Sequence, residues 1–153
     1  AIPDVDRIGH GVRCLEDDYT IQMLKDKNIT LEICPASNIE TRCLSHIGVN
    51  DHASYPLPAL LDHGLNCSLN SDDPAFFGPS VAEEYKLAHK RMGVGPDELM
   101  RMSRHALESS FIDDAKKQEL LSIFDRHIDL YLKGQCDDKS AADQTKSAPE
   151  AGL

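Results

Sequence analysis

The chain lacks the features that mark a membrane, secreted or nucleic-acid-binding protein. No apolar run approaches the ~18 residues that span a bilayer. No basic stretch precedes an apolar one near the N-terminus, so there is no recognisable secretory signal. Lys and Arg number 16 against 26 Asp and Glu, and the resulting net charge of −10 repels phosphate backbones. We therefore expect neither a membrane nor a nucleic acid as partner.

The chain also lacks Cys-x-x-Cys pairs and internal repeats. Its five cysteines are odd in number and widely spaced, which indicates free thiols in a reducing, cytoplasmic compartment. Cys34 and Cys67 fall in apolar runs and are expected to be buried strand residues, not nucleophiles. The N-terminus enters an organised segment without an initiator Met, so we expect a fragment or a processed chain.

What is present is the pattern of an α/β protein. The segments 5–11, 29–34 and 65–70 predict three short strands, the second largely apolar and the third alternating, and the segments 17–27 and 55–63 predict helices between them. This alternation predicts parallel strands joined by right-handed crossovers. A long loop is predicted at 36–54, and loops of that length in a compact domain are often functional.

Beyond the third strand the pattern becomes helical, with helices expected at 80–92, 97–109 and 112–133. Ser80 and Glu83 form the capping-box pattern at the first of these. Apolar residues recur every four positions in the last helix and predict a buried stripe: Leu120, Phe124, Ile128 and Leu132. Residues 134–153 are mainly polar and are expected to be a disordered tail, which leaves 1–133 as the folded portion.

All three predicted strands end in polar residues: His10, then Ser37 and Asn38, then the pair Asp72 and Asp73. Adjacent carboxylates repel unless a cation or a shared hydrogen-bond partner takes them up. In a parallel α/β barrel the carboxyl ends of the strands build the site, so these groups are expected to converge.

Simpler interpretations stand beside this one. An isolated Asp-Asp pair is more often a turn or a helix cap, and a lone His10 is more often a packed, hydrogen-bonded residue. Glu83 and Glu84 are most simply charges at a helix N-terminus. Three further residues could imitate a zinc cluster, although their spacing fits no closed structural site: Cys43, His46 and His52.

Several segments, taken in order, resemble the adenosine/adenine deaminase family. They are residues 7–11 (RIGHG), 32–38 (EICPASN), 69–78 (LNSDDPAFFG), 80–85 (SVAEEY) and 103–111 (SRHALESSF). The resemblance covers roughly residues 3–130, and the segment 71–78 is more similar to the adenine deaminase branch. It implies part of a TIM (β/α)8 barrel, strands six to eight with their helices, followed by C-terminal helices.

The resemblance also implies a chemistry, the zinc-dependent hydrolysis of a purine 6-amino group to a keto group with release of ammonia. Asp72 matches a zinc ligand that also touches the attacking water, and Asp73 matches a residue that hydrogen-bonds a purine ring nitrogen. His10 matches the histidine that orients this water and helps to deprotonate it. Ser37 and Asn38 are assigned only a supporting, loop-fixing role.

Departures from the family pattern limit this expectation. The chain has no His-x-His and no His-Ala-Gly-Glu phrase, which supply further zinc ligands and a proton donor in the family, and Tyr55-Pro56 replaces a frequent His-Pro. It also lacks the H-x-E and P-C-x-x-C signature of the other zinc deaminases. One aspartate does not hold catalytic zinc, which needs about three protein ligands. The chain alone is therefore expected to hold no zinc and to be inactive, and a missing N-terminal half or another chain must close the barrel.

Two other interpretations remain. The complete enzyme could act on adenosine in place of adenine, because much of the pocket that distinguishes them lies outside these residues. Alternatively, the chain is a non-catalytic remnant that acts only by binding a partner.

Overall fold

The computed structural model describes residues 4–134. The chain divides into two compact units, Ala1–Asp113 and Asp114–Leu153, and the described part of the second unit is one long helix. The predicted disordered tail, apart from Gly134, lies outside the described residues. Across residues 4–134 no helix combines the length and the hydropathy that a bilayer span needs.

The first unit is built on a sheet of three parallel strands in the order β1-β2-β3, as the sequence predicts. Ile8 pairs with Leu31, which in turn pairs with Cys67. The strands are shorter than the predicted segments because only their central residues form the ladder: β1 (Arg7–Gly9), β2 (Thr30–Ile33) and β3 (Asn66–Leu69).

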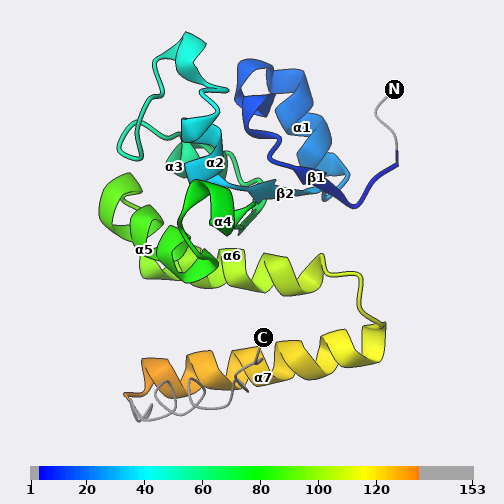
Figure 1. The fold of residues 1–153 in the computed structure, drawn as a ribbon. Coiled ribbons are helices and arrows are strands. Elements are labelled where there is room, and N and C mark those ends of the chain that lie inside the picture. Colours follow the sequence, from blue (N-terminus) through cyan, green and yellow to red (C-terminus); the bar gives the residue numbers. More distant parts are fainter. Residues whose placement is uncertain (1–3, 135–153) are drawn as a thin grey trace, which may run out of the picture. The chain divides into compact units, whose positions relative to one another are not determined.

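Helices cover both faces of this sheet. Figure 1 shows α1 and α3 on one side of the strands and α6 on the other. The helices of the first unit are α1 (Asp18–Asp26), α2 (Pro35–Glu40), α3 (Leu57–Asp62), α4 (Pro74–Phe77), α5 (Val81–Met92) and α6 (Pro96–Glu108). Short 3-10 turns lie at Val12–Glu16 and Ser45–Ile47.

Local sequence explains where these helices begin and end. The Asp17 side chain accepts from the N–H of Thr20 and caps α1, and Asn28, just beyond α1, has a left-handed φ of 54°. The capping box of Ser80 and Glu83 forms at the start of α5, as predicted. Apolar side chains of the strands and helices meet in one core, whose fully buried members include Leu24, Leu31, Leu57, Leu60, Cys67 and Met102.

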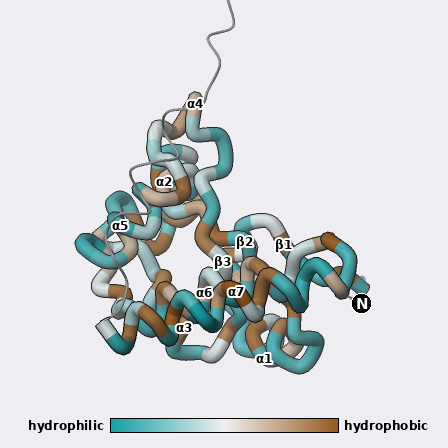
Figure 2. The backbone as a smooth tube through the Cα atoms, turned by 90° about the horizontal axis from the view of Figure 1, so that it is seen from below, coloured by the Kyte–Doolittle hydropathy of each residue, from teal (hydrophilic) through white to brown (hydrophobic). Residues whose placement is uncertain are grey.

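One prediction about the segments after the strands is wrong, and one short helix there was not predicted. The predicted loop 36–54 begins with a helix, α2, because Pro35 serves as the first helical residue, a position where a missing N–H is not needed. The turn after β3 also continues into a short helix, α4, with Pro74 in the same position. Figure 2 shows α2 and α4 together, away from α1 and α3.

The second unit contains α7 (Asp114–Leu132). The helix itself was predicted, but its buried stripe was not found: Leu120, Phe124 and Ile128 are half-buried and Leu132 is 66% exposed. A four-residue repeat places apolar side chains on one face of a helix, but only an opposing surface buries them.

Candidate active site

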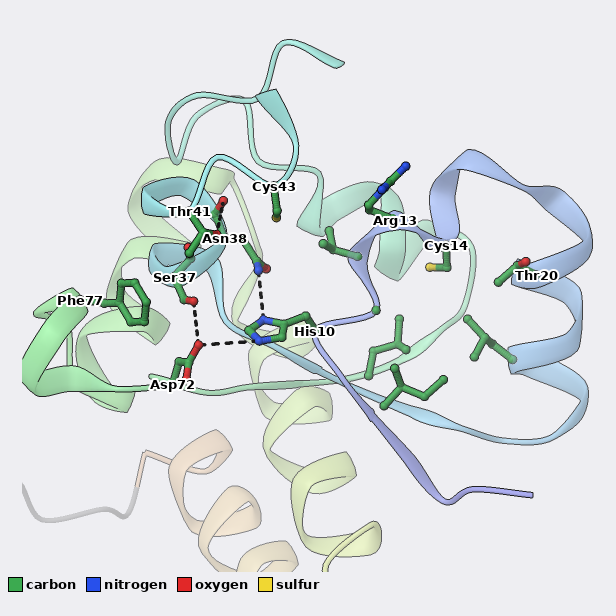
Figure 3. A pocket seen from close by; sticks show the side chains of 15 residues that line it. His10, Arg13, Cys14, Thr20, Ser37, Asn38, Thr41, Cys43, Asp72 and Phe77 are labelled. Atoms are coloured by element: carbon green, nitrogen blue, oxygen red, sulfur yellow. Dashed lines mark hydrogen bonds and ion pairs between the residues drawn. The ribbon is translucent and has the colours of Figure 1, made fainter. Parts of the chain in front are cut away.

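The polar residues that follow the three strands come together, as the sequence predicts. His10 follows β1 directly, Ser37 and Asn38 lie on α2 just after β2, and Asp72 follows β3. In Figure 3 their side chains point toward one another, joined by a chain of three contacts. Because the strands are parallel and adjacent, residues up to 62 positions apart in sequence meet at one edge of the sheet.

The contacts among these side chains are short. Asn38 Nδ2 lies 3.0 Å from His10 Nδ1, and Ser37 Oγ donates a hydrogen bond of 2.7 Å to Asp72 Oδ2. His10 Nε2 lies 3.7 Å from the same oxygen of Asp72, which is within ion-pair distance but longer than a hydrogen bond. Asp72 is therefore held by the second strand end and faces the first.

The backbone at both key residues is unusual. His10 has a φ of 58° and Asp72 a φ of 55°, both in the left-handed region that residues other than glycine rarely adopt. Gly11 continues the turn with a φ of 65°, and a Cβ there would lie 2.7 Å from Leu31 Cδ2. Such conformations persist where the surrounding structure imposes them, and they cluster at active sites.

Ser37 and Asn38 have a larger part in this site than the sequence indicates. They are 3% and 5% exposed and touch the two candidate catalytic side chains directly, so they do not merely fix a loop. Asn38 Oδ1 also accepts a 2.7 Å hydrogen bond from the hydroxyl of Tyr55, which is itself buried. Pro35 was the signal in the sequence, because proline favours the first position of a helix. The helix that begins there, α2, includes Ser37 and Asn38 among its buried residues.

Glu84 lies in the first turn of α5, as the sequence predicts, but it is not simply a charge at a helix N-terminus. Its side chain is fully buried, and Oε1 accepts a 3.0 Å hydrogen bond from the backbone N–H of Ala36 at the start of α2. Oε2 has no hydrogen-bond partner among residues 4–134. Burial raises the pKa of this carboxyl, and the Ala36 N–H opposes the shift. Glu83, its neighbour, is exposed and remains in the capping box.

Cys34 lies at the same edge of the sheet. It is buried, as predicted, and its Sγ donates to the carbonyl oxygen of Glu32. Burial, with smaller contributions from the Asp72 and Glu84 carboxylates, raises the pKa of its thiol to about 12. One ligand atom each from His10, Cys34 and Asp72 lies within 4.8 Å of the other two. Nitrogen, sulfur and carboxylate oxygen are the donors that zinc takes in proteins, so the chemistry of this cluster fits zinc.

Asp73 lies next to Asp72, but its side chain binds backbone N–H groups and not the cluster at the strand ends. Its Oδ1 accepts from the backbone N–H groups of Ala75 and Phe76, at 3.0 and 3.2 Å, and so caps α4. The side chain is exposed at this capped turn. The helix-cap interpretation of the pair is therefore correct for Asp73, whereas Asp72 belongs to the cluster at the strand ends.

Two pockets meet at His10 and Asp72. The larger, of about 800 Å³, is also lined by Ser37, Asn38 and Phe77, and Figure 3 shows it. The smaller, of about 380 Å³, is also lined by Cys34. Both volumes fall in the range of small-molecule sites, about 300–1,000 Å³. The His10–Asp72 pair is thus accessible to a ligand from two sides.

Comparisons with known proteins agree with this geometry. The adenosine deaminase family model matches residues 2–127. The adenine deaminase of Sinorhizobium medicae is 43% identical over 116 residues, which are 76% of this chain and 34% of that protein. The crystal structure of an adenine deaminase from Arthrobacter aurescens superposes with a TM-score of 0.74 at 36% identity, over 82% of this chain and 37% of the other.

An amidohydrolase from Burkholderia ambifaria, solved with bound zinc, shares the fold with a TM-score of 0.73 at 19% identity, over 86% of this chain and 35% of that one. The chain therefore spans about a third of the length of the proteins it matches. Its three strands and their helices are part of a TIM (β/α)8 barrel, which confirms the predicted fold class. The chain belongs to the adenosine deaminase family.

Proposed function

We propose that the chain is the C-terminal part of an adenine deaminase barrel. The complete enzyme adds water at C6 of adenine and releases the 6-amino group, so that adenine and water give hypoxanthine and ammonia. The observation that carries this proposal is the meeting of His10 and Asp72 at the carboxyl edge of three parallel strands. The support for adenine as the substrate is the likeness to adenine deaminases at about 40% identity.

In this proposal Asp72 is a zinc ligand. Its carboxylate is partly exposed and lines both pockets, and carboxylate oxygen is a donor that zinc takes in proteins. When bound, zinc lowers the pKa of water at the site toward about 7 and so supplies a nucleophile near neutral pH. The remaining ligands are assigned to the other strands of the barrel.

His10 and Asp73 are assigned to the water and to the purine, respectively. His10 Nε2 lies 3.7 Å from Asp72 Oδ2. The imidazole can therefore orient a water beside that carboxylate and assist the deprotonation of this water. Asp73 is assigned a hydrogen bond to a purine ring nitrogen. Its Oδ1 is engaged by the backbone of α4, which fixes the carboxylate and leaves Oδ2 for that contact.

By itself the chain is proposed to hold no stoichiometric zinc and to release no ammonia. Catalytic zinc needs about three protein ligands. Of the three donors clustered here, His10 is assigned to the water and Cys34 Sγ donates to the Glu32 carbonyl oxygen, so only Asp72 is assigned to the metal. Within the described residues the outer edges of β1 and β3 pair with no further strand. Unpaired edges associate readily with other strands. We infer that the rest of a longer chain or another chain closes the barrel, in the cytoplasm, around a purine.

The test is a chimera in which this chain replaces its aligned segment in the Sinorhizobium medicae adenine deaminase. We expect the chimera to release ammonia from adenine faster than from adenosine, and the isolated chain to release none from either. If the chimera released ammonia faster from adenosine, the chain would instead be assigned to an adenosine deaminase. A folded, zinc-loaded chimera without activity on either purine would contradict the assignment of this chain to a deaminase and favour a non-catalytic remnant.

A further inference from the structure

Tyr55 is a buried tyrosine with a specific hydrogen-bond partner next to the site. It lies just before α3, outside the strand ends that carry His10 and Asp72, and it is 2% exposed. Its hydroxyl donates a hydrogen bond of 2.7 Å to Asn38 Oδ1. Asn38 is itself 5% exposed and contacts His10, so Tyr55 reaches His10 through one intervening amide.

The phenol sets the orientation of this amide. Burial raises the pKa of the Tyr55 hydroxyl far above its ordinary value, so the group keeps its proton and acts as a donor. An asparagine amide carries an acceptor on one side and a donor on the other. A donating phenol therefore selects Oδ1 as its partner, and the amino group of Asn38 is left to face the imidazole.

The amide orientation in turn decides which imidazole nitrogen carries the proton. Asn38 Nδ2 lies 3.0 Å from His10 Nδ1, and an N–H donor requires a lone pair on the nitrogen that it meets. In a neutral imidazole one nitrogen accepts and the other is protonated. Neutral His10 therefore carries its proton on Nε2, the nitrogen that lies 3.7 Å from Asp72 Oδ2.

We propose that Tyr55 is a positioning residue that, through Asn38, holds His10 in the tautomer with the proton on Nε2. Neutral His10 then has a donor on Nε2, so it orients the attacking water by donating to the water oxygen, which also favours loss of the water's proton, while the neighbouring Asp72 carboxylate is the acceptor. The catalytic meaning of this arrangement rests on the proposed function, but the tautomer does not. If the phenol is removed, the amide is free to turn over and offer Oδ1 to a proton on Nδ1.

The test is nitrogen-15 NMR of the imidazole nitrogens in this chain, without metal or purine, at about pH 9, well above the ordinary histidine pKa of about 6.5. The His10 signals are assigned by their loss in His10→Gln. We expect the proton on Nε2 in the wild-type chain and a mixture of both tautomers in Tyr55→Phe. Asn38→Asp, whose carboxylate only accepts, should move the proton to Nδ1.

Tyr85→Phe is the matched control. Tyr85 is a partly buried phenol that accepts a 2.9 Å hydrogen bond from Ser103, so this variant also loses a tyrosine hydroxyl, but one engaged elsewhere. It should leave His10 unchanged. A wild-type His10 with its proton on Nδ1 overturns the proposal even if a variant fails to fold, and so does a folded Tyr55→Phe with the wild-type tautomer. Because no substrate is involved, either result leaves the proposed deaminase function to its own assay.

Discussion

Ser37 Oγ donates a 2.7 Å hydrogen bond to Asp72 Oδ2, although the two residues are 35 positions apart in the sequence. Ser37 is buried on α2, whereas Asp72 follows β3 in a left-handed conformation and is partly exposed. This contact connects the second and third strand ends. It holds the carboxylate that faces His10 and that we assign to zinc.

Replacing Ser37 with alanine removes this donor and should destabilise the chain by about 1 kcal/mol, the usual net contribution of one hydrogen bond. The change is measured as the free energy of unfolding in urea. Ser45→Ala is the control, because Ser45 is an exposed serine of the same unit and surface substitutions usually stay within about 0.5 kcal/mol. Equal effects of the two substitutions would show that the Ser37 hydroxyl does not stabilise the site.

Substitutions at Asp73 separate its cap from its assigned purine contact. Asp73→Ala removes the acceptor for the N–H groups of Ala75 and Phe76 and should cost about 1 kcal/mol, as for other N-caps. Asp73→Asn keeps an acceptor oxygen, so its unfolding free energy should stay near that of the wild type. Both effects are measured by urea unfolding of this chain.

In the chimera with the Sinorhizobium medicae enzyme, Asp73→Asn should nevertheless raise KM for adenine about tenfold, which corresponds to about 1.4 kcal/mol of lost binding. Asp73→Asn is thus expected to raise KM without lowering stability, whereas Asp73→Ala is expected to lower stability. If Asp73→Asn were as stable as the wild type and had an unchanged KM, the cap would be the whole role of this residue.

Glu84 should give the stability of the chain a distinct pH dependence. Burial raises the pKa of its carboxyl in the folded state above 4.5, so between the unfolded and folded pKa values the folded chain holds more protons. Stability therefore falls as the pH rises through that interval. Glutamine does not ionise, so the unfolding free energy of Glu84→Gln relative to the wild type should increase from about pH 4 to pH 7.

Glu83→Gln, one residue earlier on α5, is the matched control with the opposite sign. Hydrogen bonds from the Ser80 N–H and hydroxyl lower the pKa of Glu83, so its ionised form stabilises the folded chain above the unfolded pKa, and that contribution is lost as the pH falls. Glu83→Gln should therefore lose stability relative to the wild type as the pH rises. Parallel pH profiles for the two variants would contradict the buried position of Glu84.

Much of the fold follows from short-range patterns in the sequence. The strands and helices of the first seventy residues, their parallel order and the capping box of Ser80 and Glu83 all depend on local periodicity and caps. The meeting of His10 with Asp72 follows as well, because the carboxyl ends of neighbouring parallel strands share one edge of a sheet.

What the sequence did not reveal depends on long-range packing. Nothing in the pattern of α5 distinguishes Glu84 from Glu83, since only the position of α2 against that helix turn buries one of the two. Likewise, the hydrogen bond from Tyr55 to Asn38 arises because the segment between α2 and α3 brings the two residues together. The predicted burial of the apolar stripe on α7 was not found for the same reason, because a periodic apolar face does not specify what covers it.

The most direct test of the site is to measure zinc content and adenine deamination together in the chimera and in its Asp72→Ala variant. Asp72 accepts the Ser37 hydrogen bond and faces His10, and it is the one residue here assigned to the metal. We predict that Asp72→Ala loses both zinc and ammonia release, while a chimera with Asp72 intact keeps both. A folded Asp72→Ala chimera that retained zinc and activity would contradict the assignment of this strand end to the catalytic centre.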